Sequence, residues 1–128
     1  MLHTIDPEIL ENTIATLATT GSDGGPEMTA IWYLVEEDRI LISATARRRK
    51  TKNLAIHPHC SVLVFHPSSV NYYAEIRGVA ELIEDPAYEI SDRIAVRYDA
   101  DFRTFDGPND RRLIIAVTPE RVLITDVR

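Results

Sequence analysis

The stretch from Ile42 to Phe65 reads ISATARRRKTKNLAIHPHCSVLVF and combines signals for two strands and a helix. It opens with residues typical of a strand, passes through five basic residues within six positions, and continues with helix formers up to His57-Pro58. A second apolar run, Ser61 to His66, follows with apolar residues at consecutive positions, as expected of a strand buried on both faces. We therefore expect a strand, a helix that begins in the basic cluster, and another strand.

Further strands are predicted on both sides of this stretch by runs rich in β-branched and apolar residues. These runs are Thr13 to Thr20, Met28 to Val35, Arg39 to Ala44, Asn71 to Ile83, Arg112 to Val117 and Arg121 to Val127. Thr118-Pro119-Glu120 lies between the last two and predicts a turn, so we expect the chain to finish in a hairpin. Gly78 permits a bend or bulge in the long run that contains it.

Two Asp-Pro pairs have the form of a helix N-cap followed by a first-turn proline. Asp6-Pro7 predicts a short N-terminal helix, and Asp85-Pro86 predicts an amphipathic helix that directs Ile90, Ile94 and Tyr98 toward the core. About seven mostly antiparallel strands with two or three short helices favour a mainly β fold. Because closure removes exposed strand edges, we expect an up-and-down or Greek-key-like barrel with helices at its ends.

The length of 128 residues and the hydrophobic content of 45% suit a single domain that spans residues 1–128. No apolar run approaches the roughly 20 residues of a membrane span, and the polar, acidic N-terminus is unlike a signal peptide. The single cysteine, Cys60, excludes an intrachain disulfide. We expect a cytoplasmic protein that does not associate with membranes.

Charge is distributed unevenly along the chain. The formal net charge is -6, yet five of the fourteen Lys and Arg residues lie in the basic cluster, and Ile40 to Ala74 contains no Asp or Glu. A local cationic spot on an acidic protein favours a small anionic ligand, although a solvated basic face is the simpler alternative. A nucleic-acid partner is not expected, because no helix-turn-helix pattern or aromatic stripe accompanies the cluster.

The basic cluster lies where a strand hands over to a helix N-terminus, whose free N–H groups favour an anion. A phosphate bound there would accept charge-assisted hydrogen bonds, each contributing about 1.5–3 kcal/mol. The candidate donors are the hydroxyls of Ser43 and Thr45 and the cations Arg48, Arg49, Lys50 and Lys52.

Other chemistry has little support in the sequence. His57-Pro58-His59-Cys60 contains possible zinc ligands, but the chain has no second Cys/His pair, so we expect no metal site. A G-x-S-x-G elbow, a Gly-rich dinucleotide fingerprint and a Walker motif are all absent, and no catalytic residue can be named. If the protein is an enzyme, a bound cofactor is expected to carry the chemistry.

Three segments together resemble a known family: PEMTAIWYLV (Pro26 to Val35), Ile42 to Phe65, and EIRGVAELIEDP (Glu75 to Pro86). They resemble the FMN-binding split β-barrel superfamily of pyridoxamine 5'-phosphate oxidase-like proteins, and most of all its F420-dependent oxidoreductases. Those proteins show a T-x-x-W-Y-like second strand and an R-x-K-x-x-N-L motif, which Arg48 to Leu54 matches here. VTPERV, from Val117 to Val122, extends the resemblance toward the C-terminus.

The resemblance implies a homodimer with the cofactor in a groove at the subunit interface. Arg48 and Lys50 would hold the cofactor phosphate, with Ser43 and Thr45 alongside and Asn53 completing the motif. The cofactor ring would rest against the strand residues Thr29, Ala30, Ile31 and Trp32.

Two cofactors are compatible with this resemblance. Flavin-type relatives often use an adjacent Arg-Lys pair for the phosphate of FMN, and Arg49-Lys50 supplies one. F420 carries an acidic tail beyond its phosphate, so the additional cations Arg47 and Lys52 favour F420.

The expected activity is hydride transfer from reduced F420 to a small organic acceptor. The alternatives are an FMN-binding oxidoreductase and a non-catalytic flavin or deazaflavin binding protein. The Arg-x-His substrate motif of the pyridoxamine 5'-phosphate oxidases themselves is missing, so that activity is not expected. We expect the second subunit and the polar loop Asp99 to Asp110 to shape the substrate pocket.

Overall fold

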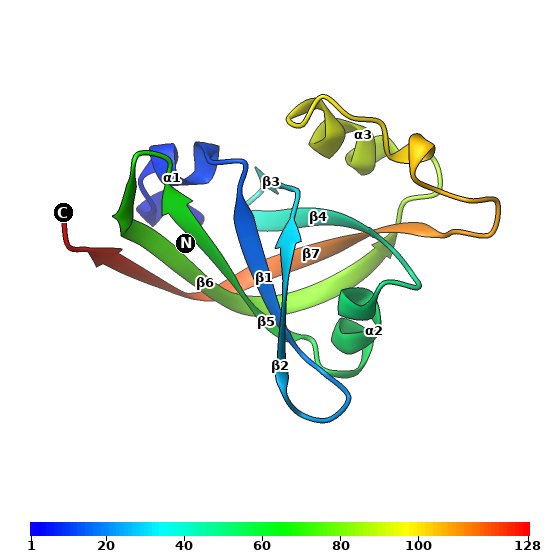
Figure 1. The fold of residues 1–128 in the computed structure, drawn as a ribbon, viewed down its shortest axis with the longest axis horizontal. Helices are drawn as coiled ribbons and strands as arrows, with labels where there is room; N and C mark the ends of the chain where they lie inside the picture. Colours follow the sequence, from blue (N-terminus) through cyan, green and yellow to red (C-terminus); the bar gives the residue numbers. More distant parts are fainter.

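The computed structural model describes residues 1–128, and its seven strands form one sheet in the order β2-β1-β5-β6-β7-β4-β3 (Figure 1). The strands are β1 (Ala15–Thr20), β2 (Pro26–Ile31), β3 (Tyr33–Glu36), β4 (Arg39–Thr45), β5 (His59–His66), β6 (Ser69–Glu84) and β7 (Arg112–Asp126). The helices are α1 (Pro7–Glu11), α2 (Arg49–Ile56) and α3 (Glu89–Val96), with 3₁₀ turns η1 (Leu2–Thr4) and η2 (Phe102–Thr104). The predicted mainly β fold with seven antiparallel strands is confirmed.

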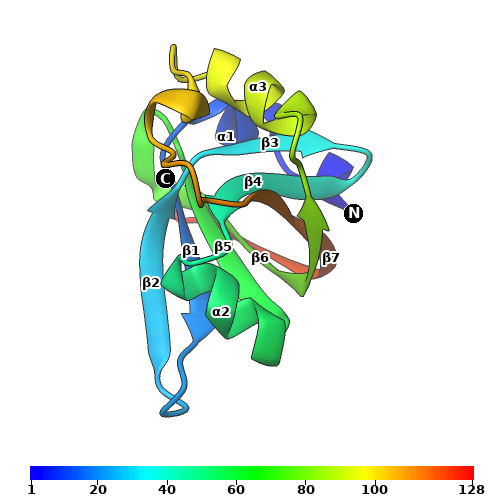
Figure 2. The ribbon, with the colours of Figure 1, turned by 90° about the vertical axis from the view of Figure 1, so that its right-hand side faces the viewer.

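The two edge strands of the sheet, β2 and β3, are consecutive in the chain and are joined through Trp32. The sheet therefore curls into a half-barrel in which its two edges approach each other (Figure 2). The prediction of one strand over Met28 to Val35 is wrong. The segment changes partner at Trp32, because Ile31 pairs with β1 and Tyr33 pairs with β4.

β7 is a single long strand, so the predicted terminal hairpin is also wrong. Pro119 lies opposite Gly78 of β6, at a register shift between Arg77 and Gly78. This irregularity is the bulge that the glycine predicted, and it accommodates a proline that cannot donate a ladder hydrogen bond. A Cβ at Gly78 would collide with the main-chain carbonyl of Thr118, so the close approach of β6 and β7 requires glycine here.

Alternation along the strands divides the buried residues into two clusters. The larger one fills the barrel and includes Leu17, Tyr33, Ile42, Ile76 and Ile115. The smaller one lies between α3 and the opposite face of β4 and β7; its buried members are Leu41, Ile94, Ala95, Phe102, Ile114 and Ala116. Ile90 and Tyr98 pack against the smaller cluster, which confirms the predicted core-facing side of this helix.

The two Asp-Pro signals have different outcomes. Asp6 caps α1 as predicted, since its carboxylate accepts the backbone N–H of Glu8 at 2.9 Å. α3 begins only at Glu89, so the predicted start at Asp85-Pro86 is wrong. The Asp85 carboxylate reaches across the intervening turn and accepts the backbone N–H of Ser91 at 2.8 Å.

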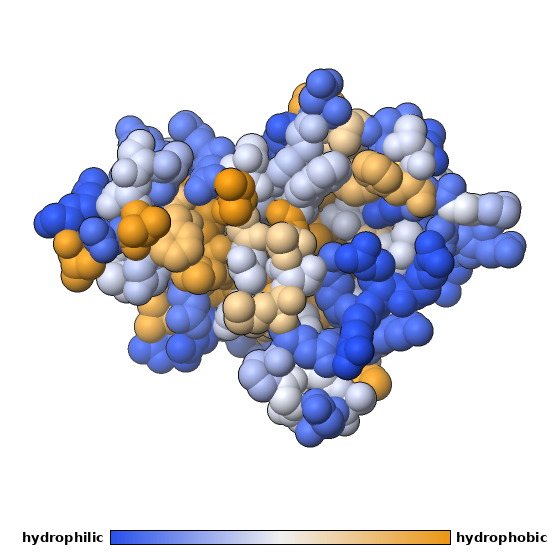
Figure 3. Space-filling model, in the orientation of Figure 1, coloured by the Kyte–Doolittle hydropathy of each residue, from blue (hydrophilic) through white to orange (hydrophobic).

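β5 is buried on one face only, which corrects the prediction of a strand buried on both faces. Val62 and Val64 point into the barrel and are 1% exposed, whereas Leu63 and Phe65 are partly exposed on the outer face. The outer surface of β2, β1 and β5 carries apolar and neutral residues (Figure 3). No helix in the structure is both long and apolar enough to cross a membrane.

Candidate functional site

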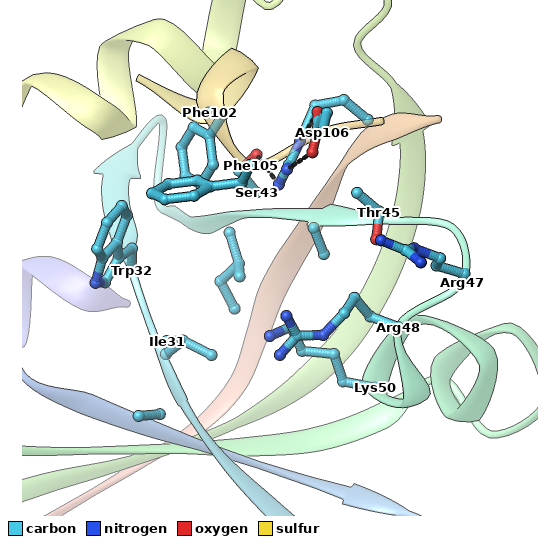
Figure 4. A pocket seen from close by; sticks show the side chains of 14 residues that line it. Ile31, Trp32, Ser43, Thr45, Arg47, Arg48, Lys50, Phe102, Phe105 and Asp106 are labelled. Carbon is cyan, nitrogen blue, oxygen red and sulfur yellow. Dashed lines mark hydrogen bonds and ion pairs between the residues drawn. The ribbon is translucent and has the colours of Figure 1, made fainter. Parts of the chain in front are cut away.

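A cavity of about 300 Å³ lies at the gap in the half-barrel, between the β2–β3 junction, the end of β4, the start of α2 and the segment around η2 (Figure 4). β3 pairs with β4 only as far as Ile42, whereas β4 continues alongside β7 to Thr45. The stretch Ser43 to Thr45 therefore has a strand on one side only. The cavity occupies the side that β3 leaves uncovered.

One end of the cavity is cationic. Arg48 is the N-cap residue of α2, Lys50 lies in its first turn, and that turn contains no acidic residue. Both side chains point into the cavity from below in Figure 4, and neither forms an ion pair. The backbone turn is fixed by Thr45, whose carbonyl accepts the Thr51 hydroxyl at 2.8 Å and the backbone N–H of Arg48 at 3.2 Å. Two unpaired cations thus flank the N-terminus of a helix, a setting that suits an anion.

The ammonium group of Lys50 is unusual within this cluster. Burial is the main reason that its pKa falls from 10.5 to about 8, and the neighbouring cations Arg48 and Arg112 lower the pKa further. An anion placed between these groups would reverse the Coulombic part of this effect.

The other end of the cavity is aromatic. Trp32 stacks on Tyr98 with ring centroids 4.7 Å apart and an interplanar angle of 11°. Phe102 and Phe105 approach the indole at 5.6 Å and 6.2 Å, and Phe105 remains 59% exposed. These rings form an apolar wall on which a planar group can lie.

A buried ion pair closes the cavity beside the aromatic wall. The guanidinium of Arg112 binds the carboxylate of Asp106 through two hydrogen bonds, and the two side chains are 6% and 5% exposed. Arg112 also donates to the hydroxyl of Ser43 at 3.3 Å, and Tyr88 donates to Asp106 at 2.6 Å. Burial raises the pKa of Asp106, but the bonds from Arg112 and Tyr88 lower it by more, so the carboxylate stays ionised.

A smaller cavity of about 150 Å³ adjoins the first and shares Arg48 and Lys50 with it. Thr29 and Arg49 line this second cavity. Arg49 turns toward Glu27 of β2 and forms two hydrogen bonds with its carboxylate, each 2.9 Å long.

The family model described as pyridoxamine 5'-phosphate oxidase matches residues 1–126. The chain belongs to this family.

Solved structures of similar proteins agree with the family assignment. One, described as an F420 reductase, is 28% identical with a TM-score of 0.78, and the match covers 90% of this chain and 93% of the other. A conserved hypothetical protein from Mycobacterium tuberculosis is 27% identical with a TM-score of 0.77, over 94% and 82% of the two chains. A putative pyridoxamine 5'-phosphate oxidase from Listeria innocua, 21% identical, shares the fold with a TM-score of 0.69 over 92% of each chain.

Most of the predicted site residues lie together in this member of the family. The larger cavity is lined by Ala30, Ile31, Trp32, Ser43, Thr45, Arg48 and Lys50. The hydroxyl of Ser43 has a structural partner, since it lies 2.7 Å from the hydroxyl of Ser91 on α3.

The remaining predicted residues lie elsewhere. Thr29 and Arg49 border the smaller cavity, Lys52 is exposed to solvent, and Asn53 is buried against β1 and β2. Arg47 lines the larger cavity and pairs with Asp110, with 2.7 Å between Nε and Oδ1.

Sequence reasoning missed six residues of the cavity: Ile42, Ala44, Phe102, Phe105, Asp106 and Arg112. The loop Asp99 to Asp110 was expected to shape a pocket, but none of its residues was singled out. The available signal was a pair of phenylalanines inside an otherwise polar loop, because exposed aromatic residues often mark a binding surface. No pattern in the sequence around Asp106 and Arg112 indicates that these two residues form an ion pair.

His57-Pro58-His59-Cys60 does not form part of this site. The structure contains no group of three or more His, Cys, Asp and Glu side chains arranged to hold a metal ion. Cys60 is buried, and burial raises the pKa of its thiol to about 11, so the thiol stays protonated and unreactive.

Proposed function

We propose that this protein binds F420 in the larger cavity and transfers a hydride from the reduced cofactor to a small organic acceptor. The observation that carries the proposal is the polarity of the cavity: unpaired Arg48 and Lys50 lie at one end and a wall of aromatic rings lies at the other. A phosphate joined to a planar ring system matches both ends at once.

The donor chemistry at the cationic end fits a phosphate group. Arg48 can offer a fork of N–H donors and Lys50 a compact positive charge, beside the free N–H groups at the start of α2. Because Lys50 is partly buried beside two other cations, binding an anion there relieves an unfavourable arrangement of charge.

The middle of the cavity suits the apolar face of a planar ring. The side chains of Ile31, Ile42 and Ala44 line it between the two ends. A ring bound there would lie against these side chains, which would exclude water from one of its faces.

When bound, F420 supplies the redox chemistry by donating a hydride to the acceptor. The chain contributes binding, orientation and exclusion of water. Asp106 is held ionised by Arg112 and Tyr88, so it cannot provide a proton to the product at neutral pH. We assign proton delivery to solvent that enters beside the exposed ring of Phe105.

F420 is favoured over FMN for two reasons. The structure described as an F420 reductase is similar to this chain over nearly its whole length. In the adjacent Arg49-Lys50 pair that would bind the phosphate of FMN, the guanidinium of Arg49 is already hydrogen-bonded to Glu27. An FMN-dependent oxidoreductase remains the second candidate, because Arg48 and Lys50 would serve its phosphate equally well.

The proposal includes a homodimer that completes the cavity. A volume of about 300 Å³ lies at the lower limit for cofactor pockets, and the cavity borders the outer face of β2, where Ala30 is exposed. That face also presents Met28, which is 73% exposed, and the partly exposed Leu63 and Phe65. A second copy seated on this apolar face would bury these residues and enclose the bound ring (Figure 3).

The proposal is tested by titrating the purified protein with F420 and with FMN, followed by assay of reduced F420 with a panel of small quinone-like and unsaturated acceptors. We expect tighter binding of F420 and oxidation of the reduced cofactor by at least one acceptor. Tight binding of FMN without binding of F420 would move the assignment to the FMN-dependent candidate. Binding of F420 without turnover of any acceptor would favour a non-catalytic binding protein.

A further inference from the structure

One carboxylate, that of Glu27 on β2, fastens the basic cluster to the β1–β2 hairpin. It accepts Nε and Nη2 of Arg49 at 2.9 Å each, in the forked geometry of a matched guanidinium–carboxylate pair. It also accepts the side-chain amide of Asn53, one helical turn farther along α2, at 2.9 Å. A single side chain thus contacts two successive turns of the same helix.

The network continues into the protein interior. The amide of Asn53 also donates to the hydroxyl of Thr19 at 3.0 Å, and Thr19 is the residue that faces Glu27 across the β1–β2 ladder. Thr19 and Asn53 are 5% and 7% exposed, whereas the side chains of Glu27 and Arg49 are 28% and 76% exposed. The hydrogen bond between Asn53 and Thr19 is shielded from water. The exposed ion pair between Arg49 and Glu27 contributes little energy, but its forked geometry fixes the orientation of the Arg49 side chain.

α2 has few other attachments. Its buried residues are Thr51, Asn53 and Leu54, and two of these three are polar. Because the apolar contact of this eight-residue helix is so small, hydrogen bonds hold its orientation to a greater degree than in an ordinary amphipathic helix.

Arg48 and Lys50 are the immediate neighbours of Arg49 in the chain. With Arg49 held by Glu27, its two neighbours face the cavities, and Figure 4 shows both side chains directed inward. We propose that Glu27 is a positioning residue: by holding Arg49 and Asn53 it fixes the first turn of α2, and so sets the placement of Arg48 and Lys50 for anion binding. The ligand in this inference rests on the function proposed above.

Whether replacing Glu27 raises or lowers the affinity for the anion distinguishes a positioning role from a purely electrostatic effect. Glu27 carries a negative charge beside a cationic site, so removing that charge would strengthen anion binding if charge alone mattered. If Glu27 positions the helix, its removal instead weakens binding, because the cations lose their fixed geometry.

The test is the affinity of Glu27→Gln for F420 and FMN, measured by titration at a temperature where the variant is fully folded. We expect binding about tenfold weaker than in the wild type, the loss of part of one charge-assisted contact. Arg49→Gln, a substitution at an exposed side chain, should give a similar loss, and the double variant should lose no more than either single variant. Unchanged or tighter binding by Glu27→Gln, or additive losses in the double variant, would overturn the proposal.

A matched control exists at the other end of the molecule. Asp126 and Arg128 form the same forked pair, with 2.9 Å in each bond, near the C-terminus. Asp126→Asn removes one carboxylate charge and one forked pair without touching α2, so its affinity should equal that of the wild type.

Amide hydrogen exchange without ligand separates failure of this inference from failure of the proposed function. Glu27→Gln should speed exchange in α2, whereas Asp126→Asn should leave it unchanged. If the wild type binds neither cofactor, the proposed function fails, and the exchange rates alone decide the role of Glu27. Equal rates of amide exchange in α2 of the wild type and of Glu27→Gln would overturn the positioning role of Glu27.

Discussion

Replacing Lys50 by methionine is expected to stabilise the unliganded protein at pH 7 while it weakens cofactor binding. The ammonium group is partly buried near Arg48 and Arg112, and the pKa of Lys50 falls from 10.5 to about 8 as a result. The folded state therefore holds this charge at a penalty that the unfolded chain does not have. Methionine keeps an apolar stem of similar length and removes the charge.

The size of the stability gain expected for Lys50→Met follows from the shift in the pKa of Lys50. Each pKa unit corresponds to about 1.4 kcal/mol, so a fall from 10.5 to about 8 gives an upper bound of about 3 kcal/mol. Because Lys50 keeps part of its contact with water, screening reduces the expected gain in unfolding free energy to about 1–2 kcal/mol.

The pH dependence of stability has a definite sign. Below pH 8 both states bind the proton on Lys50, so the penalty is fully present in the wild type. Between about pH 8 and 10.5 the unfolded state binds more protons, so the wild-type stability rises with pH relative to Lys50→Met. The advantage of the variant should therefore be largest at pH 7 and absent near pH 10.5.

Urea unfolding at pH 7 and at high pH measures this difference, with Lys52→Met as the control because Lys52 is exposed. A Lys50→Met variant that is less stable than the wild type at pH 7 would mean that the charge on Lys50 carries no penalty in the folded state. So would an advantage that does not change with pH.

Three further predictions concern Arg112, Gly78 and the pH dependence of cofactor binding. Arg112→Met should lower the free energy of unfolding by about 3–5 kcal/mol, because it leaves the buried Asp106 carboxylate without its partner; denaturant titration checks this. Gly78→Ala should destabilise by about 1–3 kcal/mol, because a Cβ would strike the Thr118 carbonyl, and thermal unfolding measures the loss. Cofactor affinity should fall as pH rises above about 8, where Lys50 loses its proton, and titrations between pH 7 and 9.5 test this.

Matched variants serve as controls for these three predictions. Gly107→Ala should be nearly neutral, since a Cβ there meets nothing closer than 3.7 Å, and equal losses at Gly107 and Gly78 would remove the role of close packing. Replacing both Arg112 and Asp106 by apolar residues should be milder than Arg112→Met; an equal loss would mean that the unpaired carboxylate is not the cause. Lys50→Arg should bind with little pH dependence, and a dependence equal to that of the wild type would assign the titration to another group.

Local patterns in the sequence were sufficient for most elements of the fold. The N-cap of α1 at Asp6 and the bulge at Gly78 follow from residue chemistry that acts over a few positions. The errors arise where long-range pairing decides the outcome. Nothing within Met28 to Val35 shows that hydrogen-bonding partners change at Trp32. Thr118-Pro119-Glu120 does not reverse the chain, because β6 pairs with β7 on both sides of the bulge.

The same distinction holds for the candidate site. Arg48 and Lys50 could be predicted because a dense basic cluster precedes a helix in an acidic chain. Arg112 could not, because it reaches the cavity only when β7 pairs with β4, whose Thr45 is its partner far away in sequence. The engagement of Arg49 by Glu27 was equally hidden, because it depends on how α2 packs beside the β1–β2 hairpin.

A cofactor phosphate is proposed to bind between Arg48 and Lys50 at the start of α2. A crystal structure of the protein with bound F420 would locate that phosphate. We expect phosphate oxygens about 2.7–2.9 Å from the guanidinium of Arg48 and the ammonium of Lys50, with the ring lying toward Trp32. A phosphate bound elsewhere, with Arg48 and Lys50 free in solvent, would contradict this proposal.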